Sequence, residues 1–317
     1  MPFTLSHAAA VLPAVRGDGT GRARLVPAVL VAGSFAPDLT YYAAGLVPGA
    51  MEFGGVTHSF PGVFGVDVLF AWVLTGWWLF VREPLVALLP RVRQGRVAAL
   101  LRCGAPPVRV RASTVARWYV SAVLGALTHV VWDAFTHVGR WGVRLFPVLD
   151  QPVAGVPLYS QLQYGTSLLG AAVVAVFAAH ALRRAPAVAP AGEAAVTEAA
   201  VAAAGEAAVT EAAVAAVAVL SARDRWRAAG ALGGCTLLGA AARVARWAAG
   251  RGPGADPFDL IPAVCFGAGA GLLAGLLGWA AAVRARRPVP VHGGPEEGPG
   301  EAVGKVGEPS ASRPGGR

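Results

Sequence analysis

The sequence predicts an all-α fold, a polytopic transmembrane helix bundle with six full spans and a short N-terminal helix. Of its 317 residues, 55% are hydrophobic and only 14% are charged, whereas a soluble domain carries about 25% charged residues. The mean hydropathy is +0.55. Because polar side chains are too few to cover a water-facing surface, we expect a multi-pass protein of the cell membrane and exclude a soluble enzyme.

The predicted helices come from apolar segments near the ~20 residues that a spanning helix needs. A shorter apolar segment, from Phe3 to Val15, is followed rather than preceded by arginines, so it lacks the layout of a cleaved signal peptide. We expect it to remain in the fold as the short N-terminal helix. The six long segments cover residues 26–46, 63–81, 117–136, 165–182, 227–249 and 258–283.

The arginines between these segments predict the orientation of the bundle. Positively charged loops stay on the cytoplasmic side of a membrane, and 19 arginines fall in alternate loops or directly after the last segment, against three in the other loops. The arginine-rich regions are 16–24, 82–117, 183–227 and the C-terminal tail, which we expect inside. The loops 47–62, 137–164 and 250–257 then face outward.

Composition also predicts four regions along the chain. A 13-residue unit, GEAAVTEAAVAAA, begins at 192 and recurs with one difference over 205–217. The repeat could be a spacer that binds a partner or a duplication without a role. The predicted regions are an N-terminal membrane domain with a metal site (1–182), a cytoplasmic Ala/Glu-rich linker (183–226), a two-helix membrane segment (227–287) and a disordered cytoplasmic tail (288–317).

Charge and cysteine content exclude two further classes of site. The net charge is +9, but the basic residues lie between apolar segments. They do not cluster with the polar and aromatic side chains that contact bases, so nucleic acid is not expected as a partner. Membrane lipids are the expected partners, and the sequence identifies no protein partner. The three cysteines are too far apart for a paired zinc motif and odd in number, which argues against a disulfide framework.

Ionisable side chains gather in the predicted span 117–136 and just beyond it. His129, Asp133 and His137 are spaced four residues apart, so they share one face of a helix. Two imidazoles and a carboxylate on one face suit a divalent metal, and ionisable groups within a membrane are costly and usually functional. The alternative is a polar stripe that bonds to neighbouring helices.

Two further polar side chains are expected near the outer end of the same region. Asp38 follows Pro37, which loosens the backbone of the 26–46 helix, and His58 precedes the second span. The predicted orientation brings both toward Asp133. Taken alone, Asp38 would be a helix cap and His58 an ordinary interfacial histidine.

The residue order carries a resemblance. SHAAA at the N-terminus, AGSFAPDL, THS and H-x-x-x-D-x-x-x-H resemble an uncharacterised bacterial membrane family with a domain of unknown function over about residues 1–182. The order is more loosely similar to LexA-regulated inner-membrane metal-dependent hydrolases, and more faintly to zinc-dependent phospholipase C. The resemblance implies metal ligands at His7, Asp38, His58, His129 and Asp133, with His137 as an addition.

A ligand role for His7 requires a particular position of the N-terminal segment. If the Phe3–Val15 segment were cytoplasmic, His7 could not reach an outer site, so the segment must dip into the membrane and pack inside the bundle. The alternative is an interfacial helix with a solvated His7.

Four other residues are weaker candidates. Asp67 could accept a hydrogen bond from a ligand histidine or cap its helix, and Glu52 could serve as a catalytic base. Arg243 and Arg246 could hold a substrate anion or extend to the lipid headgroups.

Two functions remain open at this point. The first is a membrane-embedded hydrolase that uses a divalent metal, most simply zinc, to activate water against an ester or phosphoester of a lipid-like substrate at the outer face. The second is a non-enzymatic membrane protein, either a divalent-metal permease or a scaffold with a structural metal. A permease often has broken helices, and Pro262 would interrupt the last span.

Overall fold

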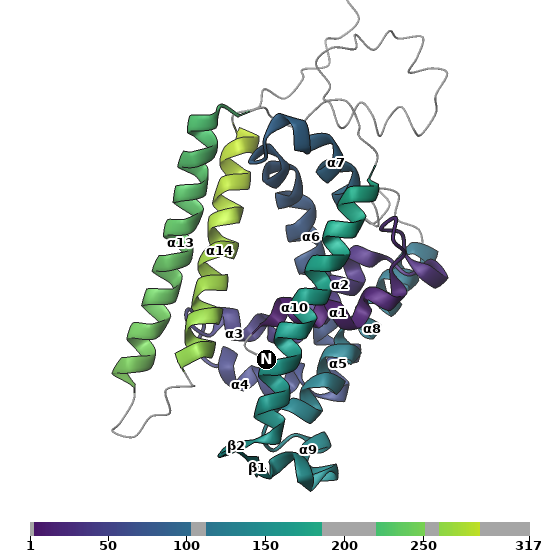
Figure 1. Cartoon of the computed structure of the whole chain (residues 1–317), viewed down its shortest axis with the longest axis vertical. Helices are drawn as coiled ribbons and strands as arrows, with labels where there is room; N and C mark the ends of the chain where they lie inside the picture. Colours follow the sequence, from purple (N-terminus) through teal and green to yellow (C-terminus); the bar gives the residue numbers. More distant parts are fainter. Residues whose placement is uncertain (1–2, 103–111, 186–219, 251–259, 286–317) are drawn as a thin grey trace, which may run out of the picture.

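The computed structural model describes residues 3–102, 112–185, 220–250 and 260–285, and this part is mostly helical (Figure 1). It departs from the all-α prediction in one place. A two-residue antiparallel hairpin pairs β1 (Pro152–Val153) with β2 (Val156–Pro157), and Ala154 and Gly155 in its turn have positive φ. The predicted repeat at 192–217 and the tail at 288–317 lie outside the described residues.

Four helices are long and apolar enough to cross a membrane, by length and composition. Each exceeds the ~20 residues that spanning requires. Figure 1 shows the N-terminal end of α13 at the same end of the molecule as the C-terminal ends of the other three, with the hairpin at the opposite end. The four are α6 (Val66–Ala87), α10 (Leu158–Arg184), α13 (Ala222–Ala249) and α14 (Leu260–Ala285).

Six full spans are not supported. The predicted span 26–46 is divided into α2 (Pro27–Phe35), the 3-10 turn η4 (Ala36–Asp38) and α3 (Leu39–Ala43), because the ring of Pro37 cannot continue a regular α-helix. The predicted span 117–136 forms α8 (Ala112–Thr136), which has 25 residues but is not among the helices apolar enough to qualify.

The remaining elements are short connections around these helices. They are η1 (Thr4–His7), α1 (Ala8–Val11), η2 (Leu12–Ala14), η3 (Arg22–Arg24), α4 (Ala50–Thr57), α5 (Phe60–Phe64), α7 (Arg91–Arg102), α9 (Trp141–Leu145) and η5 (Pro147–Asp150).

Helices α2 and α8 cross at very close range because glycine stands at the contact on each side. A Cβ at Gly33 would lie 2.5 Å from the carbonyl oxygen of Ala122, and one at Gly125 would lie 2.2 Å from that of Leu30. Small residues allow helix backbones to approach this closely in membranes. The crossing therefore brings the end of α2 and the η4 turn against the middle of α8.

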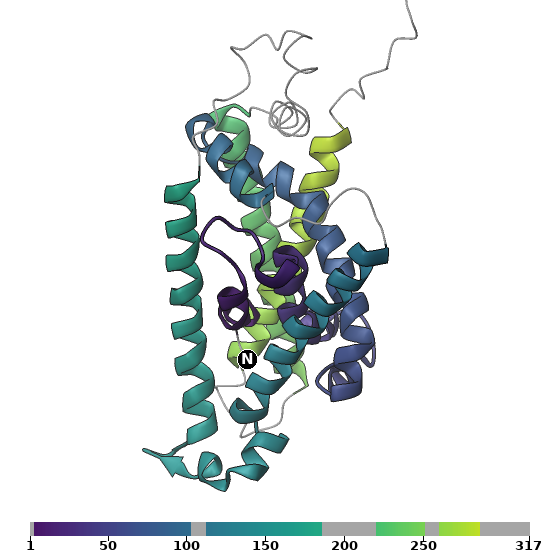
Figure 2. The same cartoon turned by 90° about the vertical axis from the view of Figure 1, so that its right-hand side faces the viewer.

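The N-terminal segment lies inside the molecule. Figure 2 shows it between α10 and the rest of the helices, and η1 contacts both α10 and α2. A Cβ at Gly170 of α10 would lie 2.9 Å from the carbonyl oxygen of Ser6. The expectation that this segment packs within the bundle agrees with the structure, since His7 is only 2% exposed.

Helices α13 and α14 form an antiparallel pair through another glycine contact. Cβ atoms at Gly239 and Gly271 would lie 2.3 and 2.1 Å from the carbonyl oxygens of Gly267 and Cys235. The pair meets the N-terminal region where Phe266 contacts the rings of Tyr41 and Tyr42, with centroid distances of 5.4 and 5.1 Å. This contact sets α13 and α14 beside the ligand-bearing helices.

Candidate metal centre

Helix α8 supplies the first two polar groups of the site. His129 and Asp133 lie one turn apart on its buried face and are 0% and 3% exposed. The His129 Nδ1 donates a hydrogen bond to the carbonyl oxygen of Ser34, 2.8 Å away, at the end of α2. This bond places the proton of a neutral ring on Nδ1 and leaves the Nε2 lone pair for a ligand.

The break after α2 supplies Asp38, which is completely buried. The hydroxyl of Thr4 donates a hydrogen bond of 2.5 Å to its Oδ2. Its Oδ1 lies 3.5 Å from the Nε2 atoms of both His58 and His129. The N-terminal η1 turn thus orients a carboxylate whose other oxygen faces two histidines.

The end of α4 supplies His58, whose orientation is fixed in the same way as that of His129. Its Nδ1 donates a hydrogen bond to the carbonyl oxygen of Gly54, at 2.9 Å. The neighbouring Thr57 hydroxyl donates to the carbonyl oxygen of Pro37, at 2.7 Å, which ties the end of α4 to the turn that carries Asp38. His58 Nε2 is therefore turned toward the carboxylates.

Asp38, His58, His129 and Asp133, which we call the ligand cluster, can hold a metal ion. One ligand atom of each lies within 4.8 Å of the others, and His58 and His129 Nε2 lie 3.5 and 3.4 Å from Asp133 Oδ2. Donor atoms about 2.1 Å from a tetrahedral ion are ~3.4 Å apart, so the nitrogen–oxygen separations match the edges of such a site better than the ~2.8 Å of a charge-assisted hydrogen bond.

The charge of the ligand cluster leads to the same conclusion. The Nε2 atoms of His58 and His129 and the Oδ1 of Asp38 are buried without a hydrogen-bond partner among the described residues. The two buried carboxylates carry a charge of −2, which is costly away from water unless it is neutralised. The imidazoles can neutralise it only by taking up protons on the Nε2 atoms that would otherwise bind a metal. A divalent cation would neutralise this charge and satisfy these atoms.

Asp133 also faces a second pair of histidines with its other oxygen. Its Oδ1 lies 3.5 Å from His7 Nε2 and 3.6 Å from His137 Nδ1. The His7 ring stacks on that of His129, with a centroid distance of 3.6 Å, and Gln163 Nε2 donates to His137 Nε2 at 3.1 Å. All six residues for which ligation was expected are therefore brought together, four in the ligand cluster and two beside it.

The weaker candidates separate into two groups. Asp67 is buried, but neither of its oxygens has a hydrogen-bond partner among the described residues. The role expected for Asp67, to accept from a ligand histidine, is taken by the carbonyls of Gly54 and Ser34. Glu52 is exposed in the first turn of α4 and is not one of the residues that line the cavity beside the site, so its position gives no support to a catalytic base.

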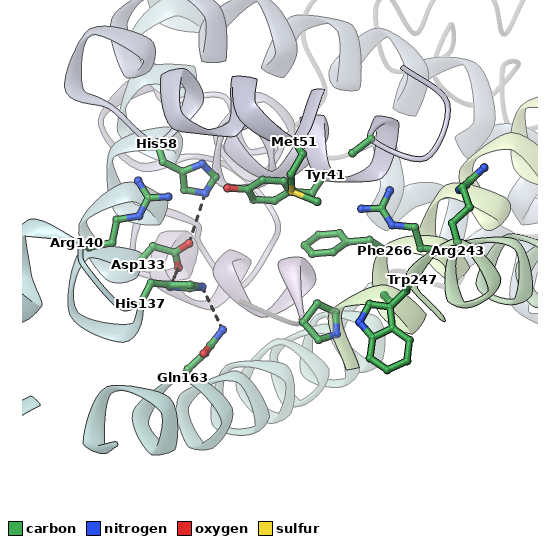
Figure 3. A pocket seen from close by; sticks show the side chains of 14 residues that line it. Tyr41, Met51, His58, Asp133, His137, Arg140, Gln163, Arg243, Trp247 and Phe266 are labelled. Atoms are coloured by element: carbon green, nitrogen blue, oxygen red, sulfur yellow. Dashed lines mark hydrogen bonds and ion pairs between the residues drawn. The ribbon is translucent and has the colours of Figure 1, made fainter. Parts of the chain in front are cut away.

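That cavity has a volume of about 530 Å³ and opens on the ligand cluster (Figure 3). His58, Asp133 and His137 form one part of its wall, and Arg243 and Arg246 form another. Figure 3 shows Arg140 beside His58 and Asp133.

Several of these functional groups were not identified from the sequence. Arg140 and Gln163 flank His137 in the cavity wall, and Thr4 holds Asp38. Isolated polar residues give no periodic signal. Thr4 and Arg140 each stand three residues from an expected ligand, His7 and His137, and this nearness is the sequence signal that could have found them. Gln163 gives no such signal.

Fold and site together define a helical protein with four helices suited to a membrane and a buried His/Asp group that can hold a metal ion. The chain belongs to the DUF4184 family, a domain of unknown function, whose model matches residues 1–277. The match extends beyond the expected 1–182 region to include α13 and most of α14. Neither the curated proteins nor the solved structures contain a match to the chain, so no characterised relative supports the resemblance to LexA-regulated hydrolases.

Proposed function

We propose that this protein is a multi-pass hydrolase of the cell membrane that uses a divalent metal, most simply zinc, to cleave an ester or phosphoester of a lipid-like substrate at the outer face. The observation that carries the proposal is the position of the ligand cluster at the wall of a large cavity. A catalytic metal needs a coordination position open to water and substrate. An ion held by the four residues of the ligand cluster would have to take a fifth ligand for this, and the cavity beside His58 and Asp133 gives water access to that position. His137, with its side chain 27% exposed, marks the open side.

The protein side chains have separate tasks in this proposal. Asp38, His58, His129 and Asp133 hold the cation, and His7 Nε2 with Oδ1 of Asp133 could contribute to a second one. His137 accepts from Gln163 at Nε2, so its Nδ1–H is directed at Asp133 and orients that carboxylate. A cation bound there would lower the pKa of a water molecule to about 7 and polarise the scissile bond. The hydrogen bonds from Thr4 and to Ser34 and Gly54 keep the ligands in position before substrate arrives.

The alternative functions receive less support from the described residues. A structural metal would need no cavity, and the ligand cluster opens on one. A permease often has broken helices, and Pro262 was expected to interrupt the last span. In the structure α14 runs from Leu260 to Ala285 with Pro262 in its first turn, where proline is tolerated. We therefore favour hydrolysis over transport.

The proposal is tested with purified full-length protein in lipid nanodiscs and two chromogenic substrates, a p-nitrophenyl ester and bis(p-nitrophenyl) phosphate. We expect zinc-dependent hydrolysis of at least one, and a loss of at least ~100-fold in rate on His58→Ala. His180→Ala is the matched control, since His180 lies on α10 away from the ligand cluster. Zinc uptake by proteoliposomes without any hydrolysis would overturn the proposal in favour of a permease.

A further inference from the structure

Three arginines line the same cavity as the metal-ligand residues. Arg140 lies beside His58 and Asp133, and Arg243 lies on the other side of the rings of Tyr41 and Phe266 (Figure 3). Arg246 completes the set from the next turn of α13. The cavity thus has a metal-binding end and a cationic wall, with aromatic rings between them.

The guanidinium groups of Arg243, which is half-buried, and Arg246, which is exposed, both reach toward another segment of the chain. A Cβ at Gly45, just after α3, would lie 2.5 Å from Nη2 of Arg246 and 3.3 Å from Nη1 of Arg243. Both guanidinium groups therefore converge on one glycine of another segment. Of the two roles considered from the sequence, anion binding fits the convergence of the two groups better than separate extension to the membrane surface.

The charge of this pair is not balanced by a carboxylate within the described residues. The arginines there that form ion pairs are Arg82 with Glu83 and Arg227 with Asp224, and the cavity wall contains one carboxylate, that of the ligand residue Asp133. Two like charges one helical turn apart repel each other. Such a pair at a cavity wall is stabilised by an anion that bridges the two guanidinium groups.

We propose that Arg243 and Arg246 form a subsite for a phosphate oxyanion of the substrate, with Gly45 providing the space in which the two guanidinium groups meet. Two planar guanidinium groups offer more N–H donors than one carboxylate can accept. They suit a phosphate group, which has several acceptor oxygens. This inference rests on the proposed function and narrows its substrate from esters in general to anionic phosphoesters. The apolar wall at Met51, Ala263 and Phe266 suits the rest of an amphiphile.

The decisive experiment measures binding of inorganic phosphate to the full-length protein by isothermal titration calorimetry. We expect Arg243→Gln combined with Arg246→Gln to weaken binding by at least ~10-fold, because each charge-assisted hydrogen bond contributes on that scale. Arg144→Gln is the matched control, because Arg144 is exposed on α9 and is not part of the cavity wall. Equal phosphate affinity in the double variant and the control would overturn the inference.

A second variant leaves both arginines intact. Gly45→Leu would fill the space in which the two guanidinium groups meet, so we expect it to weaken phosphate binding several-fold while the melting temperature stays near that of wild type. Unchanged phosphate affinity in Gly45→Leu would contradict the convergence of the two side chains on Gly45.

Two further measurements separate this inference from the metal-dependent function and identify the source of the phosphate. Asp133→Ala should lose metal but keep phosphate binding at the arginines; loss of phosphate binding in that variant, with both arginines present, would assign the anion to the metal and overturn the subsite. If phosphatidic acid in nanodiscs, but not phosphatidylcholine, displaces inorganic phosphate, the oxyanion belongs to a lipid headgroup. If neither lipid displaces it, the subsite holds a soluble phosphoester.

Discussion

Helices α8 and α13 are similar in length but are used in different ways. Helix α8 has 25 residues and buries ten of them, including His129 and Asp133. Helix α13 has 28 residues and buries only Ala228 among those described. Helix α8 carries two of the ligands and packs closely against α2 through glycine. Helix α13 packs mainly against one neighbour, α14, and its Arg243 and Arg246 line the cavity. Apolar length alone therefore does not locate function: α13 qualifies as a candidate span, whereas α8, which does not, carries the ligands.

A substitution at the glycine crossing of α2 and α8 should have the largest effect. Gly125→Ala should destabilise the protein by about 1–3 kcal/mol and reduce its metal content, because the added methyl group separates Ser34 from His129. Gly76→Ala in α6, where a Cβ meets nothing within 4 Å, should leave both unchanged. Thermal unfolding in detergent and metal analysis measure the two effects, and a stable, fully metal-loaded Gly125→Ala protein would contradict the role of the crossing.

Removing the hydroxyl that holds Asp38 should have the next largest effect. Thr4→Val keeps the side-chain shape but loses the hydrogen bond to Oδ2, so zinc affinity should fall by about 10- to 100-fold. Asp67→Asn, at the residue expected from the sequence to support a ligand histidine, should change the affinity less. Competition with a zinc chelator measures both, and a larger loss in Asp67→Asn would restore Asp67 as the supporting residue.

The α13–α14 contact should affect the cavity wall but not the ligand cluster. In Gly271→Ala the methyl group would press on the carbonyl of Cys235, so we expect weaker phosphate binding by several-fold and unchanged metal content. Gly278→Ala on the same helix, where a Cβ has open space, is the control. Loss of metal in Gly271→Ala would show that the two regions are not separable.

The smallest effect is expected from the repeated segment. Deleting residues 205–217, one copy of the 13-residue repeat, should leave membrane insertion and metal content unchanged, because no candidate ligand lies in this segment. Fractionation and metal analysis check this directly. Loss of folded protein would show that the repeat packs into the bundle.

The local part of this architecture could be predicted from the sequence. The four-residue spacing of His129 and Asp133 follows from helical periodicity, and Pro37 beside Asp38 indicated a loosened backbone. The count of spans was wrong because apolar content does not show how far a proline divides a segment into α2, η4 and α3. Long-range contacts were beyond prediction for a different reason: the close approach of Gly33 and Gly125 depends on which helix faces which, and composition does not contain that information.

Metal content of the purified protein tests the central claim most directly. Wild type, Asp133→Ala and the control Asp150→Ala, whose side chain is exposed in η5, are purified in parallel, offered micromolar zinc, manganese or iron and analysed by mass spectrometry. We expect one or two ions per chain in wild type and Asp150→Ala, and near-complete loss in Asp133→Ala with membrane insertion retained, because Asp133 faces every other ligand. Wild-type protein that takes up none of these metals, or Asp133→Ala protein that holds as much as wild type, would contradict the account.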